Sequence, residues 1–333
     1  MSPANIDTMM YAGETPWHGL GVKLDNPATS EEAIAAAGLD WEVVLAPIFV
    51  YEEEQLAFKA ILRKDTRRVF AIAKNRYMPV QNQRAFSFFD SVVGEGLAAY
   101  HTAGALGKGE KVWILAKLNG QIDVQGDKVD KFILLINSHD MSSPLKMFWT
   151  PIRVVCQNTL GMAETGIRDS LEIFSVRHTT HLDKRINQAR NILGLANNYF
   201  ERFAFLSNKL ASQKMGGIEI PKYLNFVFGQ NENLLQMGEV YSPGEERERV
   251  KILRKDVSEA RDKVKELMER GIGLGHGNDK WNAYNAVVEY VDYYKKARSK
   301  REGARLSMVW FGSGAQLKER ARRYLLEEIE DKN

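Results

Sequence analysis

The chain has 333 residues, of which 44% are hydrophobic and 27% charged, a composition typical of a globular protein with room for one large or two ordinary domains. Its net charge of +3 neither requires nor excludes a nucleic-acid partner. The single cysteine excludes an internal disulfide and a cysteine-rich zinc site, which favours a reducing compartment. We find no secretory signal and no apolar run long enough to span a bilayer, so we expect a cytoplasmic protein without a membrane partner.

The first 180 residues alternate between short helices and strand-like runs. Residues 1–25, rich in glycine and proline, are expected to be irregular. Residues 26–39 predict a helix, with Ser30 before two glutamates at its start and Gly38 at its end. The remaining predictions here are a strand at 41–51, a hairpin formed by 57–65 and 67–77 with its turn at Asp65 and Thr66, and a helix at 82–96.

Three β-branched and aromatic runs follow, and they predict an antiparallel sheet. They cover residues 111–118, 131–139 and 145–158, and the first two flank a polar connection that contains Gly120 and Gly126. Beyond residue 180 the pattern becomes helical. The predicted helices lie at 181–211, 246–271, 281–299 and 312–330, and a loop with one short element joins the first two at 212–245.

Strands that precede helices favour an α+β protein, mainly antiparallel sheet with flanking helices in the N-terminal part and mostly helical in the C-terminal part. We therefore expect an irregular segment at 1–25, a sheet domain at 26–180 and a helical region at 181–333. The segment from residue 186 onward could instead pack back onto the sheet as its second layer, so one domain remains an alternative to two.

Cys156 is a candidate nucleophile because Gln157, Asn158 and Thr159 follow it. It alternates with Ile152 and Val154 on one face of a predicted strand, where cysteine is most often a small core residue. We therefore favour the core interpretation, in which Asn158 or Thr159 caps the next helix.

His178 and His181 are three residues apart, a spacing that could present two imidazoles to one metal ion. No third ligand with suitable spacing accompanies them except Asp183, so we predict neither a metal site nor a cofactor. The segment is better interpreted as the polar entrance to a helix.

A glycine-rich stretch at 101–115 carries Lys108 and Lys111. It matches neither a Walker A loop nor a Rossmann fingerprint, because a strand and not a helix follows the glycines. It could be a basic loop that touches a phosphate backbone or a hairpin turn before a strand. Arg153, on the strand face opposite Cys156, could bind a phosphate, although a surface ion pair is the commoner use of such a residue.

The C-terminal part carries a local excess of positive charge. Between residues 295 and 323 there are ten basic and two acidic residues, with Trp310 and Phe311 among them. Cationic side chains interleaved with aromatic rings suit single-stranded nucleic acid, whereas a charged helix is more often simply a solvated face.

Four blocks together resemble a known family: "PWHGLG", "TAGALGKGEKVWILAKL", "LLINSHDMSSPLKMFWTPIRVVCQNTL" and "RLSMVWFGSGAQLKERA". Over about residues 8–325 the chain is similar to the phage/plasmid-like proteins of domain of unknown function 932, carried by bacteriophages, prophages and plasmids. The resemblance implies an origin on a mobile element and a bacterial cytoplasm, and it associates the chain with DNA replication, recombination or plasmid maintenance. It supplies no catalytic residues.

We therefore expect a non-enzymatic protein that binds nucleic acid, with single-stranded DNA as the expected form, as an accessory factor in replication or recombination. Host or phage replication proteins are further expected partners, as is a second copy of the chain. The alternatives are a factor that binds a host protein and an enzyme that uses Cys156. The residues expected to contact phosphates are Lys108, Lys111, Arg153, Arg301, Arg305, Lys318, Arg320, Arg322 and Arg323.

Overall fold

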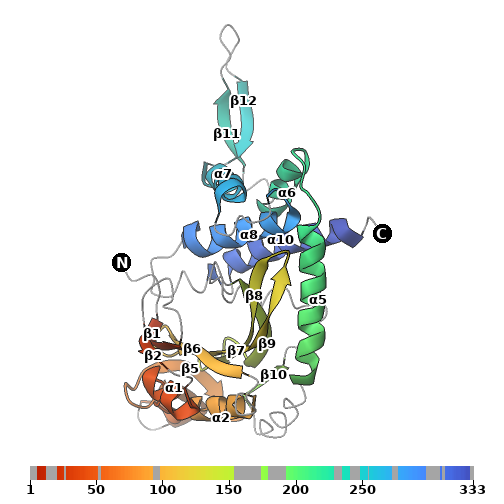
Figure 1. Cartoon of the computed structure of the whole chain (residues 1–333). Coiled ribbons are helices and arrows are strands. Elements are labelled where there is room, and N and C mark those ends of the chain that lie inside the picture. The colour runs from red at the N-terminus through yellow and green to blue at the C-terminus, as the bar shows by residue number, and fades with distance from the viewer. Residues whose placement is uncertain are drawn as a thin grey trace.

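The structure is a computed structural model of the chain, shown in Figure 1. It describes residues 6–12, 21–25, 28–51, 54–92, 98–153, 174–178, 193–228, 235–240, 248–253, 255–271, 277–297, 308–309 and 312–330.

A seven-stranded sheet forms the centre of the described part of the molecule. All neighbouring strands in it are antiparallel except the parallel pair at one edge, formed by the first two strands of the chain. In spatial order the strands are β10 (Phe174–Val176), β9 (Leu145–Arg153), β8 (Asp127–Ser138), β7 (Lys111–Val124), β6 (Ala98–Leu106), β1 (Ile6–Ala12) and β2 (Val22–Leu24).

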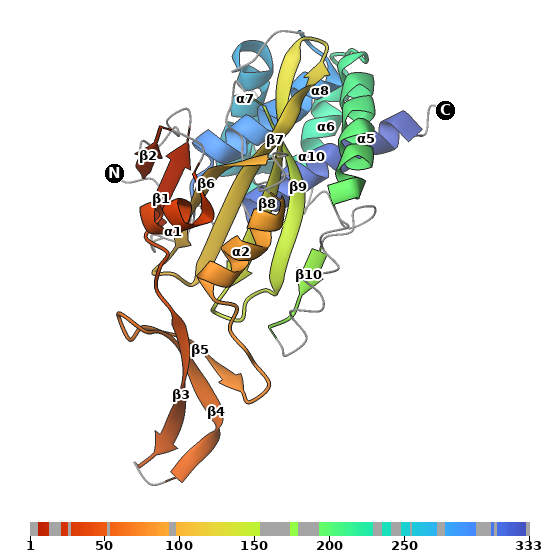
Figure 2. The same ribbon diagram turned by 60° about the horizontal axis from the view of Figure 1, so that its bottom comes forward.

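Two smaller antiparallel sheets extend from this centre. A three-stranded sheet is formed by β3 (Val43–Val50), β4 (Glu54–Arg63) and β5 (Val69–Lys74), and it projects from the body of the molecule in Figure 2. A ribbon of β11 (Leu235–Val240) and β12 (Glu248–Leu253) stands out at the helical end in Figure 1.

Two of the described helices begin at a side-chain cap. Thr29 caps α1 and shares a capping box with Glu32, and Asp279 caps α8 through the amide of Asn282. The helices are α1 (Ser30–Ala36), α2 (Asn82–Val92), α5 (Leu193–Ala211), α6 (Glu219–Phe228), α7 (Lys255–Arg270), α8 (Lys280–Glu289) with its π-helical continuation η4 (Tyr290–Tyr294), and α10 (Ser313–Glu330).

Strand register aligns apolar side chains in rows across the central sheet. One row joins Trp149, Ile133, Ala116 and Tyr100 on four successive strands. Helices cover both ends of this row. The ring centroids of Phe86 from α2 and Tyr100 lie 5.9 Å apart, and those of Phe200 from α5 and Trp149 lie 6.2 Å apart. Most of β8 is therefore buried, as expected for a strand covered on both faces.

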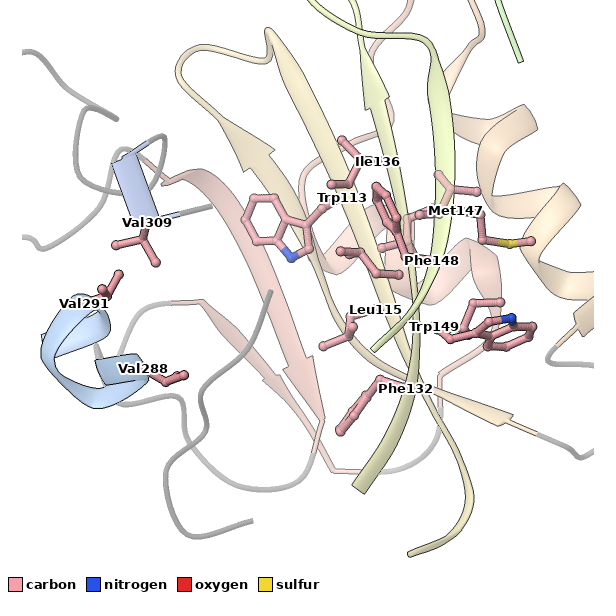
Figure 3. Packing of buried hydrophobic residues seen from close by; sticks show 14 of the residues in the cluster. Trp113, Leu115, Phe132, Ile136, Met147, Phe148, Trp149, Val288, Val291 and Val309 are labelled. Carbon is pink, nitrogen blue, oxygen red and sulfur yellow. The ribbon is translucent and has the colours of Figure 1, made fainter. Parts of the chain in front are cut away.

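The opposite face of the sheet meets the C-terminal helices. Figure 3 shows Trp113 and Leu115 on the side of the sheet that faces Val288, Val291 and Val309, and all five residues are buried. Polar contacts tie the same parts together, since the indole Nε1 of Trp281 donates to Asp127 at 2.8 Å. The helical region thus packs back onto the sheet, which was the alternative to separate domains.

The α+β fold class is confirmed, with antiparallel sheets in the N-terminal part and helices in the C-terminal part. Several details differ from the sequence prediction. The connection at 212–245 contains two elements, α6 and β11, and not one. Residues 1–25 contain β1 and β2, because β6 offers β1 a pairing edge. The cap of α1 is Thr29 and not Ser30. The sheet continues past Gly120 to a tight turn at Gln125 and Gly126. Finally, 246–271 is not one helix, since β12 precedes α7.

Candidate nucleic-acid interface

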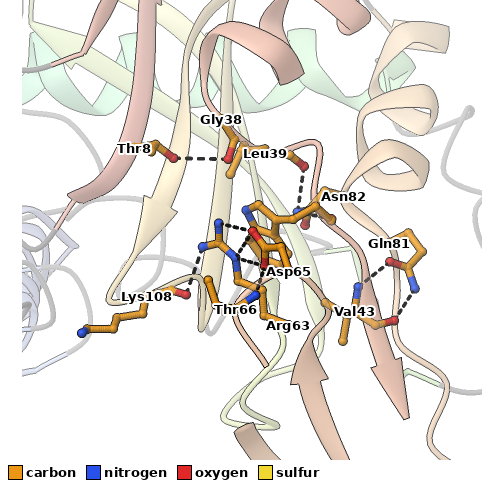
Figure 4. A network of polar contacts seen from close by, with 11 residues as sticks. Thr8, Gly38, Leu39, Val43, Arg63, Asp65, Thr66, Gln81, Asn82 and Lys108 are labelled. Carbon is orange, nitrogen blue, oxygen red and sulfur yellow. Dashed lines mark hydrogen bonds and ion pairs between the residues drawn. The ribbon is translucent and has the colours of Figure 1, made fainter. Parts of the chain in front are cut away.

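The turn between β4 and β5 lies beside the turn between β6 and β7. Arg63 joins them, because its guanidinium forms an ion pair with Asp65 at 2.9 Å and donates from Nη1 to the carbonyl oxygen of Lys108 at 3.3 Å (Figure 4). A second link is the ion pair of Arg68 with Glu110 at 3.7 Å. The hydrogen bonds from Arg63 lower the pKa of Asp65, so this carboxylate stays charged and holds the arginine. Two hairpins that lie far apart in the sequence therefore present their turns together.

The joined turns and the adjoining strand β5 carry a concentration of exposed positive charge. Between residues 57 and 77 the chain has seven basic residues and a single acidic one. In the described part of the chain, four of the exposed cations here make no ion pair, namely Arg67, Lys74, Arg76 and Lys108. We call the exposed set the basic hairpin surface, and its members are Lys64, Arg67, Arg68, Lys74, Arg76 and Lys108.

Side-chain amides dock the three-stranded sheet onto the body (Figure 4). Gln81 donates to the carbonyl oxygen of Val43 at 2.8 Å and accepts from its amide at 2.9 Å, as a strand neighbour would. Asn82 donates from Nδ2 to the carbonyl oxygen of Leu39 at 3.0 Å, so its Oδ1 is left to accept from Nε2 of His139 at 3.0 Å. These bonds fix the position of the basic hairpin surface relative to the central sheet.

Two buried imidazoles lie beneath this surface. His139 packs against the rings of Trp41 and Phe70, which also contact each other, and the guanidinium carbon of Arg63 lies 4.5 Å from the centroid of the Trp41 ring. His178 binds the hydroxyl of Tyr77 through Nδ1 at 2.8 Å. Burial lowers the pKa of His139 to about 3, with a smaller contribution from the nearby His178, and burial lowers the pKa of His178 to about 4. Both rings are therefore neutral at neutral pH.

We expect the protein to lose stability between pH 7 and pH 5. The unfolded chain takes up protons near the ordinary histidine pKa of about 6.5, whereas the folded chain does so only at lower pH, so the free energy of unfolding falls as the pH falls. The expected loss at pH 5 is about 2 kcal/mol for each imidazole. Urea unfolding at the two pH values measures it. The double variant His139→Gln/His178→Gln should show a flatter pH dependence, and an unchanged wild-type free energy at pH 5 would contradict the burial argument.

Lys108, Lys111 and Arg153 were predicted to contact phosphates from the sheet. Lys108 is exposed in the β6–β7 turn and belongs to the basic hairpin surface. Lys111 is half-buried at the start of β7, opposite Ser138 of β8. Arg153 is the last residue of β9, opposite Val129, and its side chain lies outside the described part. The glycine-rich stretch at 101–115 is strand β6, a hairpin turn and the start of β7, so it is not an open loop.

The four predicted contacts on α10 have different surroundings. Lys318 must be removed from the set, because its side chain is 2% exposed and forms an ion pair with Asp292 of η4. Arg320 is half-buried and donates to the carbonyl oxygen of Val227 at 3.3 Å, and Arg322 forms an ion pair with Glu319 at 2.8 Å. Arg323 is exposed, 5.2 Å from the Phe226 ring. α10 packs against α6 and α8, away from the end of the molecule that carries β3–β5.

Several predictions fall on residues outside the described part of the chain. They concern Arg301, Arg305, Cys156 with Asn158 and Thr159, and His181. Within the residues that the structure describes, no three histidine, cysteine, aspartate or glutamate side chains gather in a group that could hold a metal ion. None of the described helices is both long and apolar enough to cross a bilayer.

Sequence reasoning missed most of the basic hairpin surface. The predicted hairpin contains Lys64, Arg67, Arg68, Lys74 and Arg76, whereas the charge count points to a basic region near the C-terminus. The same count over residues 57–77, with seven basic residues against one acidic residue, was the signal that could have found them.

The chain matches a known protein family. A family described as Domain of unknown function (DUF932) matches residues 69–310, which is well over half of the chain. The protein belongs to the DUF932 family. The match begins at the first residue of β5 and includes the Lys108 turn, so it covers part of the basic hairpin surface. No curated protein and no solved structure matches the chain.

Proposed function

We propose that this DUF932 protein is a non-enzymatic nucleic-acid-binding protein, a cytoplasmic accessory factor in the replication or recombination of a bacteriophage or plasmid. Single-stranded DNA is its proposed ligand. Replication proteins of the host or phage are further proposed partners.

One observation carries this proposal, namely the basic hairpin surface. Six exposed cations lie on the two joined turns, on strand β5 and, in the case of Arg76, on the turn that follows β5, and four of them make no ion pair in the described part of the chain. Charged side chains on a solvated helix commonly pair with neighbours of opposite sign, as Lys255 and Glu259 do on α7. A surface with so few acidic neighbours favours a polyanion instead.

The three-stranded sheet also gives this surface access to a long ligand. It projects from the body in Figure 2, so an extended strand of DNA can pass over it without meeting the helical layer. The hydrogen bonds of Gln81 and Asn82 to the backbone hold the three-stranded sheet, and with it the backbone that carries most of these cations, in a fixed position, which reduces the entropy lost on binding.

The experiment is fluorescence anisotropy of a labelled oligodeoxythymidylate titrated with the protein. Four to six phosphates neutralised by this surface predict that affinity falls about 50- to 300-fold when monovalent salt rises from 50 to 200 mM. Absence of binding at 50 mM salt would refute the proposed function and favour a protein partner.

A further inference from the structure

The three-stranded sheet has one face that is mainly apolar. Register places Val44, Leu62 and Val69 in one row and Ala46, Ala60 and Ile72 in the next. Phe58 follows on β4, paired with Lys74 of β5. The other face carries Ile61, Ala73 and Val43, which are buried against the body. The sheet therefore has an inner face that forms core and an outer face that does not.

The outer face is exposed along β5 and at Phe58 of β4, whereas Ala60 and Leu62 of β4 are half-buried. The exposed fractions of Phe58, Val69 and Ile72 are 41%, 54% and 61%. Phe58 and Ile72 are diagonal neighbours across β4 and β5, close enough for their side chains to form one surface. A contiguous apolar face of this kind is typical of a binding site, whereas isolated exposed apolar residues are ordinary.

Charge decides between the candidate occupants of this face. Lys74 lies on the face itself, and Arg67 and Arg68 lie immediately before Val69 at one end of it. A second copy stacked on the face would bring the same cations against each other, which is unfavourable. A ligand that combines phosphates with flat apolar rings matches both the cations and the apolar centre.

We infer that the outer face of β3–β5 receives the unpaired bases of single-stranded DNA, while the basic hairpin surface holds the phosphates. This inference rests on the proposed function and adds to it the strandedness of the ligand and the place of its bases. Neighbouring strands lie about 4.8 Å apart, so the three strands span about 10 Å, enough for one or two bases. Phe58 supplies a ring for stacking, and Val69 and Ile72 supply aliphatic contacts that suit the methyl group of thymine.

A duplex cannot use this face, because its bases are already stacked and paired inside the helix. It can still bind the cations through its phosphates. The outer face therefore selects the single strand, and the basic hairpin surface alone would not.

The test compares two single-stranded 12-mers that carry the same phosphates, oligodeoxythymidylate and a strand in which every base is replaced by an abasic site. The wild-type protein should bind the thymidylate at least tenfold more tightly than the abasic strand, as expected for stacking of one or two bases. The variant Phe58→Ser/Ile72→Ser should lose this advantage and keep the affinity of the wild type for the abasic strand within about twofold.

A matched control is Phe205→Ser/Ile218→Ser, which removes the same two side-chain types from exposed positions in the helical region. This variant should bind both strands like the wild type.

Thermal unfolding of each variant verifies folding, and loss of abasic-strand affinity in a folded variant would overturn the division of roles. Equal wild-type affinity for the two strands would overturn the inference and leave the proposed function standing. Binding of neither strand would overturn both, and dimerisation abolished by Phe58→Ser/Ile72→Ser would assign the face to a second copy.

Discussion

Reversing three charges of the basic hairpin surface should weaken the binding of oligodeoxythymidylate by at least tenfold at 50 mM salt. The variant is Arg67→Glu/Arg68→Glu/Lys108→Glu, which changes both turns and places three carboxylates where phosphates would lie. Each phosphate contact contributes about 0.7 to the slope of log affinity against log salt for a single strand, so the loss of three contacts should reduce that slope by about two. Anisotropy titrations at several salt concentrations measure both quantities.

The control for this variant must change the net charge by the same amount elsewhere. Lys255→Glu/Lys265→Glu/Arg270→Glu does so on exposed positions of α7. A general electrostatic effect would weaken binding equally in both triple variants and would contradict a local interface. The single variant Arg323→Glu tests the exposed arginine of α10, and a large loss there alone would locate the interface on the helical region.

Breaking the buried ion pair of Lys318 with Asp292 should have the largest effect on stability. The side chains are 2% and 13% exposed, so removing one charge leaves the other in a poorly solvated environment. Asp292→Asn keeps the volume of the side chain and removes only its charge. We expect the free energy of unfolding to fall by about 3–5 kcal/mol. Urea denaturation at pH 7 measures the change.

Two further variants show whether burial is the cause. Asp262 pairs with Lys265 at 3.8 Å on the exposed side of α7, so Asp262→Asn should change stability by less than about 1 kcal/mol. Replacement of both buried partners, in Lys318→Met/Asp292→Leu, should recover most of the loss, because no charge then remains buried. A loss in Asp292→Asn no larger than that in Asp262→Asn would show that Lys318 reaches solvent.

The sequence predicted the helices and strands themselves more successfully than it predicted which of them pair or pack together. Alternation and turn residues placed the β4–β5 hairpin, and apolar spacing placed α2 and α10, because both signals are properties of neighbouring residues. β1 was missed, because its strand conformation depends on an edge that β6 offers some 90 residues later in the chain. Tertiary pairing of this kind leaves no local pattern.

The candidate site shows the same limit. A charge count along the chain treats Lys318 and Lys108 alike, yet one is buried and the other exposed. The helical spacing of apolar residues indicates that Lys318 is buried, since Leu317, Ala321 and Leu325 form a buried stripe of α10 and Lys318 lies beside it. The meeting of the two basic turns depends on Arg63 and on the clamp formed by Gln81 and Asn82, which no spacing rule in the sequence predicts.

The measurement that tests the central claim most directly is photocrosslinking of a bromodeoxyuridine-substituted single strand to the protein, followed by mass spectrometry of the linked peptides. Our account predicts crosslinks in the peptides that span residues 57–77 and 101–111, which contain Phe58, Val69 and Ile72 of the outer face and the Lys108 turn. It also predicts that these crosslinks disappear when unlabelled oligodeoxythymidylate competes. Competable crosslinks confined to α10 and its neighbours, or none at all, would contradict it.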